Sequence, residues 1–427
     1  DQSIMRRIAY TGRRALCSAS PLANTFPGVE GEMPFTSSLA LHDPEVDATI
    51  PCFRVVDESG APIKGAEDLC EAMGKKMVTG LYTTMVRLNA MDNILYDAQR
   101  QGRISFYMTS FGEEAAVVGS AAAFDTSDTM FGQYREAGAL MHRGFTYQEF
   151  IDQCFSNIGD PAKGRQMPMH FGSAALNFQT ISSPLATQIP QAAGAAYALK
   201  VQATAAGKEA TEQCVACYFG EGAASEGDFH SAMNFAATLE CPVVFICRNN
   251  GYAISTPARE QYRGDGIIGR AAGYGMASIR VDGNDIFAVH AATAAARAFA
   301  VEHSRPVMVE VMAYRVGHHS TSDDSTRYRT VEEIQTWRKE RCPIRRTRAA
   351  LEARGWWDED REQALRDGER TKVLEALLEG ETKEKPALLE ALFDDVYDEL
   401  PPHLVAQRAE LEAHLAKYPD QYALEEH

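Results

Sequence analysis

The residues best placed to do chemistry lie in two glycine-containing turns. One turn, residues 220–223, reads Gly-Glu-Gly-Ala, and the other, residues 248–252, reads Arg-Asn-Asn-Gly-Tyr. Glu221 supplies a carboxylate and Asn250 a side-chain carbonyl, and Mg²⁺ prefers such hard oxygen ligands together with the phosphates of its ligand. Glycine lets the backbone come close to a ligand at both turns. The pair therefore predicts a diphosphate bridged by magnesium.

The elements that must position these turns are two strands and the helix between them. Residues 214–219 and 242–247 are short apolar runs, and residues 226–239 carry apolar side chains at helical spacing. In a right-handed βαβ unit the strands are parallel, so their carboxyl ends share the sheet edge where open α/β sheets bind ligands. The helix after Gly222 is expected to point its N-terminal amides there, which suits a diphosphate.

Three simpler interpretations compete with a diphosphate site. A Rossmann turn would need a third glycine, which residues 220–225 lack, and the chain has no Walker loop. Cys214 and Cys217 have the spacing of a zinc or redox pair, but they fall on a predicted strand without a second ligand pair. The glycines could serve tight turns alone. An acid and an Asn-Asn pair, each closing a strand, favour a ligand site instead.

The wider pattern indicates an α/β protein with a doubly wound parallel sheet. Strands and helices alternate between residues 190 and 315, with a strand at 277–281, a helix to His303 and a strand at 306–314. Upstream, residues 67–101 predict one long helix that Gly102 ends. Its buried face has the 3-4 spacing of a core-facing helix: Leu81, Met85, Leu88, Met91 and Leu95.

Composition excludes several classes of protein. The chain has 427 residues and a net charge of −17, which argues against nucleic acid and anionic membrane surfaces as partners. No apolar run approaches the roughly 20 residues of a membrane span. Nine scattered cysteines do not form a disulfide framework. We therefore expect a soluble protein of a reducing compartment.

The two ends of the chain differ from its middle. Residues 1–25 hold four arginines, several hydroxyls and no acid after Asp1, which is typical of a mitochondrial transit segment. A merely basic tail is the alternative. Residues 26–61 indicate an extended arm, residues 62–385 the α/β domain, and residues 386–427 a helical C-terminal arm.

The full run at 220–256 resembles a known family. Gly-Glu-Gly-Ala-Ala-Ser-Glu-Gly-Asp, followed by Arg-Asn-Asn-Gly-Tyr-Ala-Ile-Ser-Thr, is similar to the thiamine diphosphate signature of branched-chain 2-oxo acid dehydrogenase α subunits of the eukaryotic mitochondrial type. The resemblance extends from about residue 50 to the C-terminus. One departure from the wider thiamine family is Glu221, where aspartate is commoner. The resemblance implies oxidative decarboxylation of branched-chain 2-oxo acids in the mitochondrial matrix, with acyl transfer to a lipoyl group, in branched-chain amino acid catabolism.

The resemblance also implies roles for individual residues. His319 would be catalytic, through proton transfer, and Ser320 would be the serine that a dedicated kinase phosphorylates. Magnesium would be held by Glu221, Asn250 and Tyr252. Thiamine diphosphate would contact Gln133, Tyr134, Arg135, Ser183, Leu185, Gly222, Ala223, Arg248 and His319. A potassium ion would be held by Ser182, Pro184, Thr187 and Gln188.

Without the resemblance, the same residues have plainer interpretations. Arg135 would be an ion-pair partner, residues 182–188 a helix start with hydroxyl caps before a helix over 191–198, and the pair at 318–319 solvent-exposed histidines. His170 is best interpreted as an ordinary hydrogen-bonded histidine.

The number of diphosphate motifs predicts partners. A thiamine enzyme also needs a module for the aminopyrimidine, and this chain shows a single diphosphate motif in one α/β domain. The other half is therefore expected from a β subunit, in a two-α, two-β heterotetramer. The resemblance adds a lipoyl-bearing acyltransferase core, a regulatory kinase and a phosphatase, and no nucleic acid or membrane partner. Two alternatives stay open: a pyruvate dehydrogenase α subunit, and a catalytically silent regulatory scaffold of the same fold.

Overall fold

The structure, a computed structural model, describes residues 37, 49–208, 211–394 and 396–422. The chain divides into a unit of residues 1–49 and a unit of residues 50–427. Only Ser37 and Thr49 of the first unit are described, so the expected transit segment and most of the expected arm lie outside the described residues. The fold below is that of the second unit, and the domain boundaries given above stay predictions.

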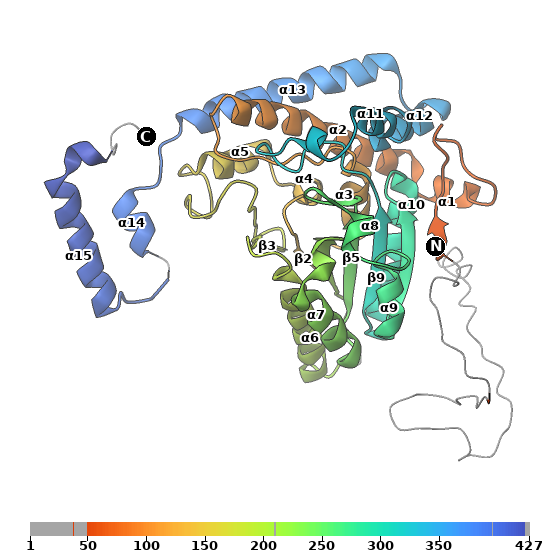
Figure 1. Cartoon of the computed structure of the whole chain (residues 1–427), viewed down its shortest axis with the longest axis horizontal. Helices are drawn as coiled ribbons and strands as arrows, with labels where there is room; N and C mark the ends of the chain where they lie inside the picture. Colours follow the sequence, from red (N-terminus) through yellow and green to blue (C-terminus); the bar gives the residue numbers. More distant parts are fainter. Residues whose placement is uncertain (1–36, 38–48, 209–210, 395, 423–427) are drawn as a thin grey trace. The chain divides into compact units, whose positions relative to one another are not determined.

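A parallel sheet forms the centre of this unit (Figure 1). Its seven strands have the order β1-β8-β9-β5-β4-β2-β3, and every neighbouring pair is parallel. The strands are β1 (Cys52–Phe53), β2 (Thr129–Phe131), β3 (Phe178–Gln179), β4 (Val215–Gly220), β5 (Val243–Asn249), β8 (Ala277–Asp282) and β9 (Val307–Met312). A separate antiparallel pair consists of β6 (Tyr252–Ala253) and β7 (Thr256–Pro257). Strand β1 belongs to the segment predicted as an arm, and it pairs with β8.

Helices cover both faces of the sheet. They are α1 (Glu67–Ala72), α2 (Gly74–Arg100), α3 (Glu114–Ala121), α4 (Ala137–Arg143), α5 (Tyr147–Phe155), α6 (Gln188–Ala205), α7 (Gly227–Thr238), α8 (Ala258–Gln261), α9 (Gly269–Gly273), α10 (Ile286–His303), α11 (Val331–Glu340), α12 (Pro343–Ala353), α13 (Glu359–Thr382), α14 (Leu388–Phe393) and α15 (Pro402–Lys417). Helices α6 and α7 pack together on one face, and α10 and α3 pack together on the other (Figure 1).

Strand β4 shows why the sheet needs two covering layers. Side chains of a strand alternate between its two faces. Val215, Cys217 and Phe219 join the core beneath α6 and α7, whereas Ala216 and Tyr218 join the core beneath α3 and α10. All five are buried. The predicted doubly wound parallel sheet is confirmed, and Cys214 and Cys217 are free, buried core residues.

Several helix boundaries differ from expectation for local reasons. The helix predicted over 67–101 is interrupted at Gly74, which has φ +64°, although its predicted buried face is buried throughout. Helix α6 extends well beyond the 191–198 predicted. The helix expected over 226–239 is α7 (Gly227–Thr238), but a 3₁₀ turn over Ala223–Ser225 and the extended residue Glu226 separate it from Gly222.

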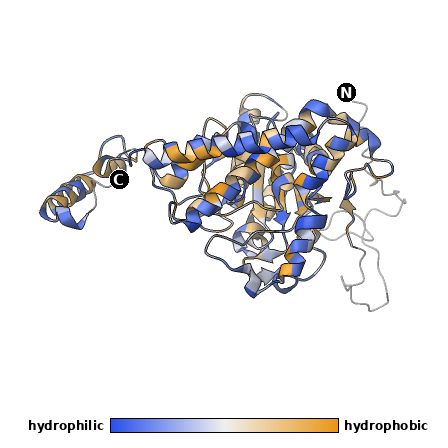
Figure 2. Ribbon diagram, turned by 90° about the horizontal axis from the view of Figure 1, so that it is seen from above, coloured by the Kyte–Doolittle hydropathy of each residue, from blue (hydrophilic) through white to orange (hydrophobic). Residues whose placement is uncertain are grey.

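Hydropathy follows this layering. Figure 2 shows apolar residues on the strands and on one side of the covering helices, with hydrophilic residues on the other side. Long helix α13 packs its buried Val373 and Leu377 on the region of α2 and α5. Among the described residues, no helix is both long and apolar enough to span a bilayer.

Candidate cofactor and metal site

One pocket of about 330 Å³ lies where four adjacent strands end. Strands β2, β4, β5 and β9 end at Phe131, Gly220, Asn249 and Met312, and the segments that follow them supply most of its walls. The pocket is lined by Gln133, Tyr134, Arg135, Leu185, Gly220, Glu221, Gly222, Ala223, Arg248, Asn250, Tyr252, Ala253, Ile254, Arg315 and His319. Nearly all the residues proposed for cofactor and magnesium therefore meet in one place.

Glu221 is a buried carboxylate without a strong partner. It is 1% exposed, and its nearest hydrogen-bond donors are the backbone N–H of Asn250 at 3.4 Å and the side-chain Nε2 of Gln261 at 3.5 Å. Burial raises the pKa of Glu221 above its usual range, and the charge of Glu113 acts in the same direction. Gln261 Oε1 is also buried without a hydrogen-bond partner among the described residues. The weakly bonded Glu221 carboxylate and the unpartnered Gln261 oxygen fit a cation.

The second turn presents one of its two asparagines to the pocket. Asn250 donates Nδ2 to Glu113 at 3.0 Å, and its Oδ1 accepts from the Tyr252 amide at 3.2 Å. Asn249 faces away and donates to Tyr262 and Glu310. In the described part of the chain no three His, Cys, Asp or Glu side chains gather as a metal cluster. A cation here would need amide, backbone and phosphate oxygens besides Glu221, as Mg²⁺ accepts.

Three buried arginines surround the pocket, and they differ in how their charge is balanced. Arg248 is held between Glu113 at 2.6 Å and Glu136 at 2.7 Å, and these carboxylates raise its pKa against the effect of burial. Arg135 bonds the carbonyls of Thr109 and His319, with Glu113 only at 4.0 Å.

Arg315 donates to the Tyr252 and Ile254 carbonyls, and its Nε has no partner among the described residues. Burial and the charge of Arg135 lower its pKa. The positive charge available to an anion therefore belongs chiefly to Arg135 and Arg315, more than to Arg248.

His319 lies between those two arginines. Its Nδ1 is 3.4 Å from a nitrogen of Arg135 and 3.4 Å from a nitrogen of Arg315. Burial and both guanidinium charges lower the pKa of His319 to about 3. Because guanidinium groups only donate, Nδ1 is the accepting nitrogen and Nε2 carries the proton of the neutral ring.

The segment proposed for potassium lies beside the pocket, and only Leu185 of it lines the wall. Ser183 contacts His170 Nε2 at 2.7 Å, while His170 also bonds backbone carbonyls, as expected of a structural histidine. The expected hydroxyl cap is absent, because Thr187 donates to the Pro184 carbonyl at 3.0 Å. Gln188 donates to the Tyr218 carbonyl. The potassium ligands Ser182, Pro184, Thr187 and Gln188 stay a prediction.

The loop after β9 is tied to the pocket by its own side chains. Asp323 accepts from the His319 amide at 2.8 Å and from the Tyr328 hydroxyl at 2.6 Å. That hydroxyl accepts from Arg315 at 2.8 Å, and Arg329 bonds the Arg315 and Gly317 carbonyls. Ser320 is 8% exposed within this network.

Sequence reasoning missed three residues that shape the pocket: Glu113, Glu136 and Arg315. Arg315 follows β9 directly, so its place at a strand end was a usable signal. The two glutamates had no such signal, because each meets Arg248 across more than a hundred residues of chain.

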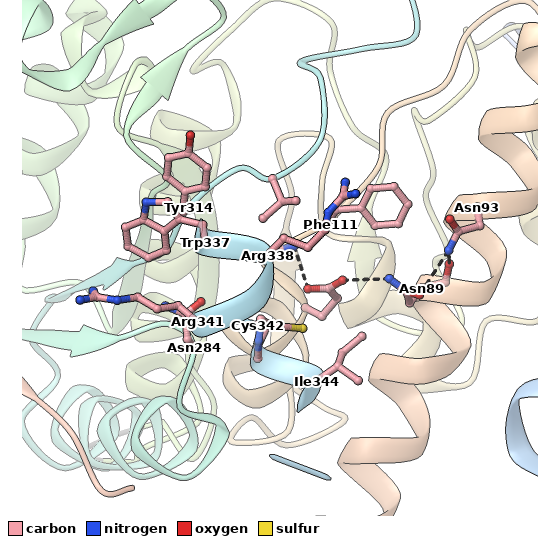
Figure 3. A pocket seen from close by; sticks show the side chains of 14 residues that line it. Asn89, Asn93, Phe111, Asn284, Tyr314, Trp337, Arg338, Arg341, Cys342 and Ile344 are labelled. Atoms are coloured by element: carbon pink, nitrogen blue, oxygen red, sulfur yellow. Dashed lines mark hydrogen bonds between the residues drawn. The ribbon is translucent and has the colours of Figure 1, made fainter. Parts of the chain in front are cut away.

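A second pocket, of about 260 Å³, contains none of the predicted site residues (Figure 3). Tyr314 and Trp337 stack in its wall with ring centroids 4.7 Å apart. Glu114 points into it, accepting from Gly112 at 2.9 Å and from Asn89 at 3.3 Å. Adjacent residues thus face different surroundings: Arg315 lines the first pocket and Glu113 pairs with Arg248 behind its wall, whereas Tyr314 and Glu114 line the second pocket.

Comparisons with known proteins identify the family of the chain. Residues 82–388 match the family model described as dehydrogenase E1 component. The chain is 54% identical over 400 residues to human 2-oxoisovalerate dehydrogenase subunit alpha, mitochondrial, covering 94% of this chain and 87% of that protein. The Dictyostelium discoideum protein of that name is 53% identical over 412 residues, or 96% and 89% of the two chains. Subunit alpha 1 of Arabidopsis thaliana is 50% identical over 397 residues, or 93% and 82%.

Proposed function

The chain belongs to the dehydrogenase E1 component family, and we propose that it is the α subunit of a thiamine diphosphate-dependent dehydrogenase for 2-oxoisovalerate and related branched-chain 2-oxo acids. Similarity to proteins of that name over 93–96% of the chain supports the substrate class. The observation that carries the proposal is the meeting of Glu221, Asn250, Arg135 and His319 in one pocket at a parallel sheet edge.

The pocket fits a diphosphate with a divalent cation. Glu221, the Asn250 side-chain oxygen and the Tyr252 carbonyl would hold Mg²⁺, while Arg135 and Arg315 would face the phosphate oxygens. Gln133, Tyr134, Gly222 and Ala223 line the same space. When bound, thiamine diphosphate supplies the nucleophilic carbon and the electron sink for decarboxylation of a 2-oxo acid.

His319 is the candidate catalytic side chain. The neutral ring keeps a proton on Nε2 because Arg135 and Arg315 occupy Nδ1. At neutral pH the ring can therefore donate a hydrogen bond from Nε2 to a reacting group, and proton transfer would require a bound diphosphate to raise the pKa of His319. Arg135 and Arg315 also fix the ring in place, which limits the freedom that a reacting group must lose.

The proposed partners follow from what the pocket lacks. The described pocket residues supply metal and phosphate ligands at one sheet edge, and a β subunit in a two-α, two-β heterotetramer would supply the aminopyrimidine half. A lipoyl-bearing acyltransferase core would receive the acyl group. A kinase and a phosphatase acting on Ser320, a potassium ion at residues 182–188 and a mitochondrial matrix location complete the proposal. The relatives' names carry the word mitochondrial, which supports that location.

Co-expression with a β chain tests this function. The assembled pair is expected to decarboxylate 2-oxoisovalerate with thiamine diphosphate and Mg²⁺, and to act on pyruvate far more slowly. The α chain alone should be inactive because it holds half a site. Preference for pyruvate would support the pyruvate dehydrogenase alternative, and inactivity on every 2-oxo acid would support the silent scaffold.

A further inference from the structure

Glu113 occupies the junction between three pocket residues, although it does not itself line the pocket. It is the last residue before α3 and is 0% exposed. One oxygen lies 2.6 Å from Arg248, and the other accepts from Asn250 Nδ2 at 3.0 Å and is 4.0 Å from Arg135. Its carboxylate makes no capping hydrogen bond to α3, so these contacts are its role.

Neutralising Arg248 does not account for this placement. Glu136 also pairs with Arg248, at 2.7 Å, and it too is 0% exposed. A single carboxylate would balance a single guanidinium. A second buried carboxylate has a desolvation cost, so it is expected where it makes a further contact. The contacts that distinguish Glu113 are its hydrogen bond with Asn250 at 3.0 Å and a longer approach to Arg135 at 4.0 Å, of which the first is the shorter and directional one.

The charge on Glu113 decides which way the Asn250 amide faces. Glu113 lies 2.6 Å from the Arg248 guanidinium, which can only donate, so it pairs there as a carboxylate. An ionised carboxylate only accepts hydrogen bonds, and an asparagine amide has nearly the same shape after a half turn. Asn250 must therefore direct its nitrogen to Glu113 and its oxygen away from Glu113, where Oδ1 accepts from the Tyr252 backbone N–H at 3.2 Å.

We propose that Glu113 is a positioning residue for the cation site, fixing the Asn250 amide with its oxygen available to Mg²⁺. This inference rests on the proposed function. The partner of a metal ligand commonly changes metal affinity without touching the metal. Glu113 acts in that way from a neighbouring segment, 137 residues from Asn250 along the chain.

The test compares Glu113→Gln with two matched variants in the assembled α and β chains. Glu136→Gln removes the other carboxylate from Arg248 without touching Asn250. Glu114→Gln changes the adjacent buried acid, which lines the second pocket. Calorimetry at fixed thiamine diphosphate gives the Mg²⁺ concentration for half-maximal binding. Glu113→Gln should raise it by about tenfold or more, and Glu114→Gln should leave it within about twofold of the parent. Glu136→Gln should raise it less than Glu113→Gln does, because the Glu136 carboxylate also accepts from the Gln133 and Tyr134 backbone amides but does not contact Asn250.

A double variant in which both partners of the hydrogen bond are changed provides a second test, which can be used if Glu113→Gln alone assembles poorly. In the double variant Glu113→Gln with Asn250→Asp, the glutamine amide can donate to one aspartate oxygen and leave the other for the cation. We expect this pair to recover Mg²⁺-dependent binding, whereas Asn250→Asp alone places two carboxylates against each other and should lose it.

Equal Mg²⁺ dependence of Glu113→Gln and Glu136→Gln, or no recovery in the double variant, overturns this inference alone. A parent protein whose thiamine diphosphate binding ignores Mg²⁺ overturns the proposed function as well.

Discussion

At the scale of single residues, buried charge determines what the pocket can hold. Arg248 is matched by Glu113 and Glu136, so Arg135 and Arg315 face the cavity with only Glu221 as a remaining acid. That acid has few donors of its own. A magnesium diphosphate would satisfy both sides, because the cation meets Glu221 while the phosphates meet the arginines. An apolar or cationic ligand would leave these buried groups uncompensated.

The protonation of His319 gives a prediction at this scale. Its folded-state pKa of about 3 lies below the value of about 6.5 for an unfolded histidine. Between these two pH values His319 is protonated in the unfolded chain but neutral in the folded chain. Its contribution therefore lowers the free energy of unfolding as pH falls from about 6.5 to about 3.

A bound diphosphate adds negative charge nearby and should raise the pKa of His319, so cofactor binding near pH 5 should take up protons. Calorimetry in buffers of different ionisation enthalpy measures this uptake. His319→Asn should abolish it, and His318→Asn, a histidine outside the pocket wall, should not. Equal proton uptake by both variants would show that His319 is not the group that becomes protonated when the cofactor binds.

At the scale of elements, the site depends on close backbone packing between the segment before α3 and the segment after β9. Gly112 has φ +89°, and a Cβ there would lie 2.2 Å from the Tyr314 carbonyl oxygen. The segment carrying Glu113 and Glu114 therefore packs directly on the segment carrying Tyr314 and Arg315. This approach separates the two pockets and holds Glu113 against Arg248.

Gly112→Ala is expected to break that contact. The backbone conformation alone costs an alanine about 1–2 kcal/mol, and the clash with Tyr314 adds to it. Gly102→Ala is a matched control, because Gly102 has φ +78° but no atom within 4 Å of its Cβ position. Thermal melting should show a clearly larger loss for Gly112→Ala, together with weaker cofactor binding. Equal melting temperatures would show that the packing is not needed.

The loop of residues 317–329 gives a second prediction at this scale. A phosphate on Ser320 would add nearly two negative charges beside Asp323, inside the network that ties this loop to Arg315 and His319. Ser320→Glu should therefore retain the melting temperature and lose acyl transfer to the lipoyl partner. Ser322→Glu introduces the same charge at an exposed position and should stay active. If Ser320→Glu matches Ser322→Glu in activity, the loop is no switch.

The elements predicted from sequence are those set by local pattern. Apolar runs at 214–219 and 242–247 became β4 and β5 because side-chain alternation and short length specify buried strands. Their parallel pairing then brings Glu221 and Asn250 to one edge. Contacts such as Glu113 with Arg248 could not be predicted, because they join distant segments and leave no periodic signal. The restart of α7 at Gly227 depends on one extended residue, Glu226, which propensity does not reveal.

At the scale of the whole molecule, the pocket explains why partners are expected. The sheet edge gathers ligands for a diphosphate and a cation, while the cofactor's other ring needs its own binding surface. The chain's net charge of −17 makes nucleic acid an unsuitable partner. The family match over residues 82–388 includes the pocket and every strand of the parallel sheet except β1. The proposed function therefore depends on one residue above all, Glu221, which would hold the cation that binds the diphosphate.

Calorimetric titration of thiamine diphosphate into the assembled α and β chains, with and without Mg²⁺, tests this claim most directly. The parent should bind tightly only with Mg²⁺, and Glu221→Ala should weaken that binding by on the order of a hundredfold, about 2.7 kcal/mol. Glu226→Ala removes the same charge from an exposed position five residues away and should bind as the parent does. Equal, Mg²⁺-dependent affinity in Glu221→Ala and Glu226→Ala would contradict the account.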